Sequence, residues 1–151
     1  MFDSGEDSLN HYLQKQATQD IKRNLSAVYV LIERDVPDVL GCYTLCASSV
    51  LLDNIPQELT KKLPRYLLIP VTFLGRLAID IGLQGQGLGE LLLVDALKRA
   101  GNLSNELGSM AVIVEALNSK AAAFYEKFGF QKFLDKTGQL FLSMNVIKKI
   151  L

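Results

Sequence analysis

Three glycines at alternate positions, Gly85, Gly87 and Gly89, form the first group of residues whose spacing indicates chemistry. They separate residues 74–80, an apolar run typical of a buried strand, from residues 90–100, whose apolar spacing predicts a helix. The first N–H groups of a helix have no intrahelical acceptor and lie at the positive end of its dipole. Glycine has no Cβ and accepts positive φ, so a phosphate can approach such a loop closely. The stretch therefore predicts a pyrophosphate-binding site.

Two common nucleotide-binding motifs do not fit this stretch. The glycines follow a G-x-G-x-G pattern and not the Rossmann G-x-G-x-x-G, and no Lys follows them as it would in a P-loop. A plain glycine-rich turn in front of a core helix stays open as the alternative to a binding loop.

Residues 118–130 form a second motif, Asn-Ser-Lys-Ala-Ala-Ala-Phe-Tyr-Glu-Lys-Phe-Gly-Phe. Asn118 and Ser119 are residue types that cap helix starts, and Gly129 is of the type that follows a helix end. The motif therefore predicts a short helix, and residues 111–117 before it predict a buried strand.

The two motifs together resemble the two signatures of the GNAT N-acetyltransferases. Gln84-Gly-Gln-Gly-Leu-Gly89 is similar to the acetyl-CoA signature Q/R-x-x-G-x-G/A. Residues 118–130 are similar to the second signature, in which an Asn opens a helix that ends Tyr-Glu-Lys-x-Gly-Phe. The motifs stand in the family's order, and the resemblance covers nearly the whole chain. It implies the GNAT fold, acetyl-CoA as the cosubstrate, and transfer of an acetyl group to a primary amine.

The resemblance also implies which residues hold acetyl-CoA. The pantetheine would pair with the backbone of a strand at Leu77, Ala78 and Ile79. The loop would hold the pyrophosphate through Gln84, Gly85, Gln86, Gly87, Leu88 and Gly89. Asn118 would contact the cofactor or orient the helix of the second motif, and Phe124 would contact the cofactor.

Tyr125 is the implied general acid. A phenol with a pKa near 10 can protonate the thiolate that leaves the thioester, although a buried core aromatic is the alternative reading. The resemblance implies that a backbone N–H near Ile79 stabilises the oxyanion. The general base stays open between Asp80, Glu115 and no dedicated base, because either carboxylate can equally be a cap or an ion-pair partner. Cys42 and Cys46 share a strand face and are expected to be small core residues.

The composition fits a single globular domain, residues 1–151, with a sizeable core. Lys and Arg together number 16, as do Asp and Glu, so the formal net charge is zero, which argues mildly against a nucleic-acid binder. No apolar run approaches the ~20 residues that span a bilayer, and the acidic start is not typical of a signal peptide. Two cysteines and one histidine make a poor metal-ligand set. We expect a cytoplasmic protein without a metal.

The predicted elements alternate in an α+β order. We expect a helix over about 9–24 capped by Asp7 or Ser8, a hairpin of strands 27–33 and 39–50, and a short helix at 57–63. A lead-in at 66–73 precedes strand 74–80; the next helix continues to residue 107, and the last strands are 130–134 and 139–146, joined by a turn at 136–138. This order predicts a mixed, mainly antiparallel twisted sheet with helices on both faces. The family usually has another strand before its first helix, so we expect that strand to be missing or to precede this sequence.

Two stretches narrow the resemblance to one branch of the family. Residues 2–13, Phe-Asp-Ser-Gly-Glu-Asp-Ser-Leu-Asn-His-Tyr-Leu, resemble its opening Phe-x-Cys-Gly-x-x-x-Leu-Asp-x-x-Leu, with Ser4 at the Cys position. Residues 74–80, Leu-Gly-Arg-Leu-Ala-Ile-Asp, resemble its central strand. The branch includes bacterial toxins that acetylate the aminoacyl group of charged tRNA and pair with ribbon-helix-helix antitoxins. The resemblance thus implies aminoacyl-tRNA, an antitoxin and a second copy of the chain as partners.

Three functions remain as hypotheses at this point. The first is a toxin that acetylates aminoacyl-tRNA, which the two branch motifs favour. The second is a housekeeping N-acetyltransferase of a small amine, peptide or protein, which the neutral charge favours. The third is a non-enzymatic module that binds coenzyme A and acts through a partner.

Overall fold

The computed structural model describes residues 2–57, 61, 68–134 and 138–150. They form two compact units, which we describe separately. The first unit holds the chain up to Cys46 together with Leu74–Leu97, and the second holds the described residues of Ala47–Phe73 and Lys98–Leu151. Three elements have residues in both units: β2 (Val39–Leu51), β3 (Leu68–Ile79) and α4 (Leu88–Leu103).

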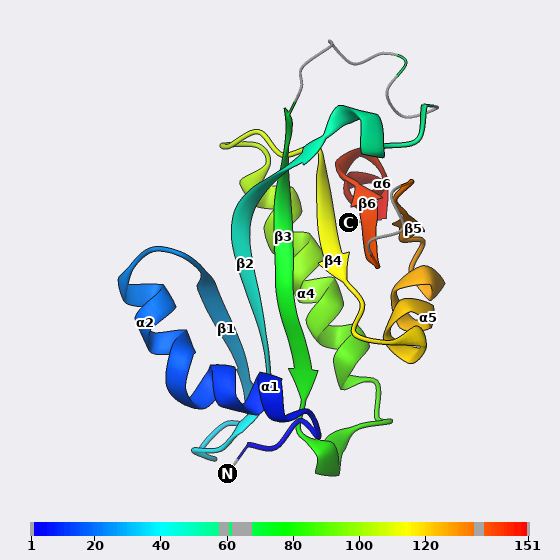
Figure 1. The fold of residues 1–151 in the computed structure, drawn as a ribbon. Helices are drawn as coiled ribbons and strands as arrows, with labels where there is room; N and C mark the ends of the chain where they lie inside the picture. The colour runs from blue at the N-terminus through cyan, green and yellow to red at the C-terminus, as the bar shows by residue number, and fades with distance from the viewer. Residues whose placement is uncertain (1, 58–60, 62–67, 135–137, 151) are drawn as a thin grey trace. The chain divides into compact units, whose positions relative to one another are not determined.

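The strands of the described chain belong to one sheet (Figure 1). The remaining strands are β1 (Ala27–Ile32), β4 (Ala111–Glu115), β5 (Gln131–Lys132) and β6 (Gln139–Ser143). The order in the sheet is β1-β2-β3-β4-β6-β5. The pairs β1–β2, β4–β6 and β5–β6 are antiparallel. The α+β class and the mainly antiparallel sheet predicted from the sequence are therefore confirmed.

The first unit opens with one helical stretch made of α1 (Asp7–His11), the π-helical turn η1 (Tyr12–Gln16) and α2 (Ala17–Lys22). The predicted helix is present, but it begins earlier than expected, and the prediction that Asp7 or Ser8 caps it is wrong. The N-cap is Glu6, whose side chain makes no capping bond. The nearby hydroxyl of Ser4 instead accepts a hydrogen bond from the Glu6 N–H at 3.1 Å.

Helices cover both faces of the sheet in the first unit, as predicted. Leu9 and Leu13 of the opening helical stretch pack against a cluster that contains Cys42 of β2. The next residue along β2 points to the opposite face. On that face, the hydroxyl of Tyr43 donates a short hydrogen bond to the carboxylate of Asp95 in α4.

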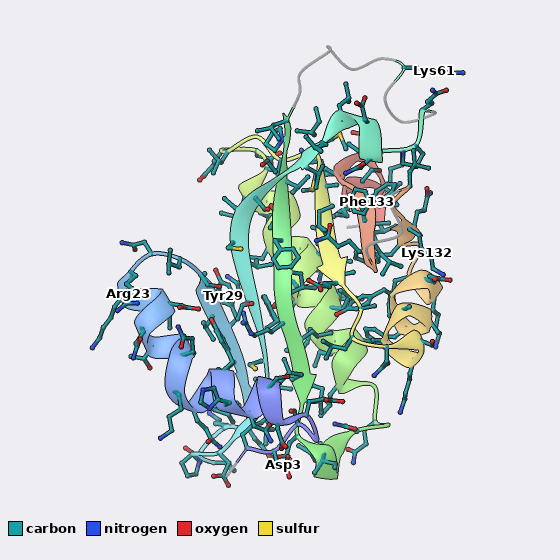
Figure 2. All side chains as sticks on the ribbon, in the orientation of Figure 1. Asp3, Arg23, Tyr29, Lys61, Lys132 and Phe133 are labelled. Atoms are coloured by element: carbon teal, nitrogen blue, oxygen red, sulfur yellow. The ribbon has the colours of Figure 1, made fainter. Side chains whose placement is uncertain are left out.

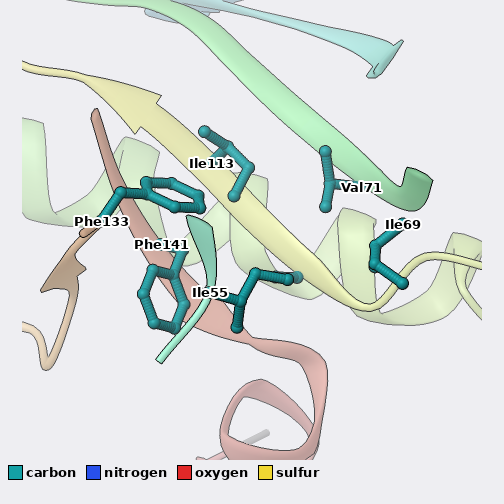
Figure 3. Close-up of a cluster of buried hydrophobic side chains, with 7 residues drawn as sticks. Ile55, Ile69, Val71, Ile113, Phe133 and Phe141 are labelled. Atoms are coloured by element: carbon teal, nitrogen blue, oxygen red, sulfur yellow. The ribbon is translucent and has the colours of Figure 1, made fainter. Parts of the chain in front are cut away.

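The core of the second unit is a cluster of aliphatic and aromatic side chains from the strands β3, β4 and β6, from Ile55 after η2, and from Phe133 directly after β5 (Figure 3). Its buried members are Ile55, Ile69, Val71, Ala111, Ile113, Phe133 and Phe141. The rings of Phe133 and Phe141 lie 5.0 Å apart at an angle of 54°. Tilted aromatic pairs of this kind stabilise a core by more than the burial of their area alone.

The second unit also contains η2 (Leu52–Asn54), α5 (Ser119–Lys127) and α6 (Met144–Ile150). The prediction of a strand through residue 146 is wrong, because β6 ends at Ser143 and α6 follows directly. The Ser143 hydroxyl accepts a hydrogen bond from the Val146 N–H at 3.3 Å, as a helix cap does. Ile147 is fully buried, so packing favours the helix over an extended strand.

Several other boundaries differ from the prediction. The helix expected to reach residue 107 ends at Leu103, where the Ser104 hydroxyl donates to the carbonyl of Gly101 at 2.7 Å and competes with helical bonding. The strand expected over 130–134 is only two residues long. The predicted helix 57–63 and turn 136–138 lie outside the described residues, apart from positions 57, 61 and 138.

Candidate functional site

The predicted anion-binding loop lies in the first unit, between the end of β3 and the start of α4. A short helical turn, η3 (Ile81–Leu83), follows the strand and leads into the loop. Gly85 and Gly87 have φ values of +83° and +80°, which glycine adopts without strain. A Cβ at either position would meet no heavy atom within 4 Å. Both glycines therefore face open space, and a ligand can reach their backbone.

The start of α4 supplies the donors that such a loop needs. Its first helical bond runs from the Leu91 N–H to the Gly87 carbonyl at 3.1 Å. Leu88 and Gly89 lie in this first turn, so their N–H groups have no acceptor within the helix. These N–H groups sit at the positive end of a helix of 16 residues. The geometry is that of an anion site on a helix N-terminus.

The side chain of Gln84 is turned back toward the protein. Its Nε2 donates to the carbonyl of Ser4 at 2.8 Å and to the carbonyl of Ile79 at 3.0 Å. The amide therefore fixes the start of the loop to two backbone segments of the first unit. Gln86, between the two glycines, is exposed.

Asp80 acts as a cap in this structure. Its Oδ1 accepts a hydrogen bond from the Gly82 N–H at 3.0 Å, and its Oδ2 accepts one from the Asp3 N–H at 3.1 Å. The sequence left the role of Asp80 open between a base, a cap and an ion-pair partner. In the structure this carboxylate is a cap. Glu115, the other candidate base, is exposed at the end of β4.

The strand that was expected to pair with pantetheine offers backbone groups and few side-chain groups. Ala78 and Ile79 are almost fully buried, and Leu77 is half-buried. β3 has 12 residues and β4 has 5, so β4 can pair with fewer than half of the residues along that edge of β3. In the second unit, the Met110 N–H donates to the carbonyl of Pro70 at 2.9 Å and aligns the beginnings of the two strands.

Asn118 caps α5 in the second unit. Its Oδ1 accepts a hydrogen bond from the Ala121 N–H at 2.9 Å, and its own backbone is extended. The prediction that this residue opens the helix is confirmed. Gly129, with φ of +96°, follows the last turn, as predicted from the sequence.

Tyr125 lies near the end of α5 and is 7% exposed. Its ring packs edge-on against Phe124, with centroids 5.3 Å apart, and at a tilt of 59° against Phe130, with centroids 5.5 Å apart. Burial raises the pKa of its phenol to about 12. The hydroxyl therefore stays protonated at neutral pH, which is the state that a general acid needs.

The cysteines are poor nucleophiles. Cys42 is 5% exposed, and burial raises the pKa of its thiol to about 11. Burial also raises the pKa of Cys46. Both thiols are free, and thiolates would be scarce at neutral pH. Among the described residues, no group of three His, Cys, Asp or Glu could hold a metal ion, and no helix is long and apolar enough to cross a bilayer.

One part of the site was not anticipated. Residues 2–6, which we call the N-terminal turn, contact the segment between β3 and the glycine loop through Asp3 and Ser4. Figure 2 shows Asp3 beside the end of β3. The sequence contains a turn signal here, but the partners lie far along the chain, so no local pattern could reveal the contact.

Residues 26–132 match the family described as "Acetyltransferase (GNAT) domain". The match includes the glycine loop, Asn118 and Tyr125. It covers well over half of the chain.

Three relatives are similar over most of their lengths. A "tRNA-acetylating toxin" of Mycobacterium tuberculosis (strain ATCC 25618 / H37Rv) is 38% identical over 130 residues, which are 86% of this chain and 76% of the toxin. The structure of a KacT mutant with one tyrosine replaced by phenylalanine superimposes with a TM-score of 0.93 at 35% identity, covering 99% of this chain and 89% of that one.

The third relative is AtaT, whose solved structures include bound molecules. AtaT complexed with acetyl-methionyl-tRNAfMet has a TM-score of 0.91 and is 37% identical, covering 99% of this chain and 89% of that one. A tyrosine-to-phenylalanine mutant of AtaT, bound to the C-terminus of the antitoxin AtaR and to acetyl-CoA, has a TM-score of 0.83 and is 34% identical, covering 99% and 87%.

Proposed function

The chain belongs to the GNAT acetyltransferase family, and from this we propose that it transfers the acetyl group of acetyl-CoA to the amine of an aminoacyl-tRNA. Such a reaction removes a charged tRNA from translation, so the protein would act as a toxin in the cytoplasm. The relatives described as a tRNA-acetylating toxin and as AtaT with acetyl-methionyl-tRNA support this acceptor.

The observation that carries the acetyl-CoA half of the proposal is the open loop at Gly85 and Gly87. Its glycines have positive φ and unoccupied space where side chains would be, and it leads into the N-terminus of α4. We propose that the pyrophosphate binds the N–H groups of residues 84–89. The pantetheine would pair with the backbone of Leu77, Ala78 and Ile79, with Asn118 and Phe124 as further contacts.

Tyr125 is proposed to protonate the leaving thiolate. A pKa of about 12 makes the phenol a weaker acid than free tyrosine. The same lack of water destabilises a thiolate, and so raises the proton affinity of the leaving group as well. Burial thus raises the pKa of the phenol and that of the leaving thiol together, so proton transfer from Tyr125 to the thiolate stays energetically feasible. The Ile79 N–H would stabilise the tetrahedral oxyanion that forms before the thiolate leaves.

The acceptor amine needs no strong base in this scheme. Both carboxylate oxygens of Asp80 already accept backbone hydrogen bonds, which is the role of a cap. An α-amino group has a pKa of about 8 even when free. A substantial fraction is therefore neutral at physiological pH, and water can accept the proton lost after attack.

An antitoxin is expected to accompany such an enzyme. AtaT has been solved with the C-terminus of the antitoxin AtaR bound. We propose that a ribbon-helix-helix antitoxin neutralises this chain as well. Its presence would be required for growth of cells that express the active protein.

The test is cell-free translation with the wild type, Tyr125→Phe and the matched control Tyr12→Phe. Tyr12 is also a buried tyrosine, but it lies in η1 of the first unit and has no role in the proposed chemistry. The wild type and Tyr12→Phe should stop translation in the presence of acetyl-CoA and label aminoacyl-tRNA with radioactive acetyl. Tyr125→Phe should do neither while still binding acetyl-CoA.

Other outcomes would refute parts of the proposal. Equal inhibition by Tyr125→Phe would remove the acid role of this tyrosine. Unaffected translation, together with acetylation of a free amine or peptide, would favour the housekeeping acetyltransferase, which the zero net charge of the chain also fits.

A further inference from the structure

Three hydrogen bonds attach the N-terminal turn to the segment that carries the glycine loop. The Asp3 N–H donates to Asp80 Oδ2 at 3.1 Å, and the Asp3 carbonyl accepts from the Ile81 N–H at 2.6 Å. The carbonyl of Ser4 accepts from Gln84 Nε2 at 2.8 Å. Gln84 directly precedes Gly85, so these bonds end where the positive-φ loop begins.

The N-terminal turn is itself held by one side chain of α1, that of Asn10. Its Oδ1 accepts from the Ser4 N–H at 2.7 Å and lies 2.8 Å from the Ser4 hydroxyl oxygen, which donates to it. Its Nδ2 donates to Asp3 Oδ1 at 2.8 Å, and the Gly5 N–H donates to the same oxygen at 2.9 Å. The two hydrogen bonds, that of Gly5 first, lower the pKa of Asp3.

Apolar contacts hold the turn from its other end. Phe2 is 9% exposed and packs in a cluster with Cys42 and Ala78. A methyl group on Gly5, whose φ is +85°, would lie 3.3 Å from Ile81 Cδ1. The turn is thus in contact with the loop segment through backbone and side chains alike, although neither part belongs to a regular strand pair.

We propose that Asn10 is a positioning residue for acetyl-CoA binding and that the N-terminal turn is a built part of the cofactor site. This inference rests on the proposed function of the glycine loop. Gly85 and Gly87 have no side chains to restrict them, so the loop needs external contacts to keep its N–H groups pointed at a ligand. Ordering the loop before the cofactor arrives lowers the entropy lost on binding. Asn10 provides this order through Ser4 and Gln84 without contacting the cofactor.

The first experiment is a calorimetric titration of purified protein with coenzyme A. Asn10→Ala removes both halves of the side-chain bridge, and the Kd should rise about fivefold, as loss of a net hydrogen bond predicts. The KM for acetyl-CoA should rise by a similar factor while kcat is retained. Gln19→Ala is the matched control, because this exposed amide lies on the same helical stretch and outside the turn.

The second experiment uses only the wild type and keeps the inference testable if Asn10→Ala folds poorly. Amide hydrogen exchange is followed with and without coenzyme A. Binding should slow exchange of the N-terminal turn as well as of the loop, because coupling between the two is reciprocal. A structural role without coupling would leave exchange of residues 2–6 unchanged by the ligand.

The outcomes separate this inference from the proposed function. Unchanged Kd in Asn10→Ala, or ligand protection limited to the loop, would overturn the positioning role and leave the acetyl-CoA site intact. No binding of coenzyme A by the wild type would refute the proposed function itself.

Discussion

Replacing Gly87 by alanine tests whether the loop binds a phosphate or is only a turn. The φ of Gly87 is +80°, and its Cβ would meet nothing within 4 Å. The methyl group therefore fits sterically, and the cost to the folded state is the left-handed backbone alone. That cost is about 1–2 kcal/mol, offset in part by the lower entropy of alanine in the unfolded chain. The net loss of about 1 kcal/mol should lower Tm by about 2–4 °C.

The substitution should weaken the binding of coenzyme A far more than it lowers the stability of the protein. The new methyl group would project into the space where the pyrophosphate is proposed to lie and would move it away from the N–H groups of α4. Each hydrogen bond to a charged group contributes about 1.5–3 kcal/mol. Loss of one such bond should raise the Kd for coenzyme A about 10- to 100-fold. Calorimetry and thermal unfolding of the same preparation measure the two effects side by side.

Gly138→Ala is the matched control for this variant. Gly138 has nearly the same φ, +82°, and its nearest prospective contact is the Ala116 carbonyl at 3.9 Å, so it should show a similar fall in Tm. Its affinity for coenzyme A should equal that of the wild type. If Gly87→Ala loses stability but binds coenzyme A as Gly138→Ala does, the loop is a plain turn and the proposed pyrophosphate site is refuted.

Three further predictions concern the fold around the site. Asn118→Ala removes the cap of α5 and should cost about 1 kcal/mol in thermal or denaturant unfolding; Asn118→Asp should restore most of this loss. Gly41→Ala places a Cβ 2.7 Å from Ile79 Cδ1 and 2.9 Å from the Ala78 carbonyl, and such overpacking should cost about 1–3 kcal/mol. Calorimetry that finds no change in Tm would contradict the tight approach. Finally, burial raises the pKa of Tyr125 from 10.0 to about 12. The protonated phenol therefore makes its full contribution to the free energy of unfolding below pH 10, and this contribution is lost as the pH rises from 10 to 12. Urea unfolding should show the wild type losing about 3 kcal/mol more than Tyr125→Phe over this interval, and parallel curves would show that the phenol is not desolvated.

The parts of the fold that local sequence determines were predictable. The glycine pattern and the apolar run before it predict the loop between β3 and α4. Asn118 predicts the start of α5, because its side chain accepts a hydrogen bond from the N–H of a residue only three positions further along. Val39–Leu51 was recognised as a strand from its composition, with its end one residue from the prediction. In each case the residues that interact are only a few positions apart, or the apolar residues repeat with the period of a single helix or strand.

The elements that the sequence did not predict correctly have bounds that depend on contacts between distant segments. α6 was missed because Leu140, Phe141 and Leu142 continue into Val146 and Ile147 with a spacing that a strand and a helix both allow; the Ser143 cap and the burial of Ile147 decide between them. The boundary of the first helix was displaced because Ser4 bonds the Glu6 N–H, and Ser4 is placed by Asn10 and Gln84. Such choices depend on contacts that do not exist until distant segments meet.

The attachment of the N-terminal turn also sets an order of events during synthesis. Asp3 and Asp80 are 77 positions apart, and Ser4 and Gln84 are 80 apart. Contacts of this separation form slowly, because the chain between them must first lose much of its freedom. The turn leaves the ribosome before the segment after β3 does, and it remains without its partners until that segment emerges. The loop can therefore reach its binding shape only late in folding. For an enzyme proposed to bind acetyl-CoA at this loop, the cofactor site therefore depends on a contact that forms only after both segments have been synthesised.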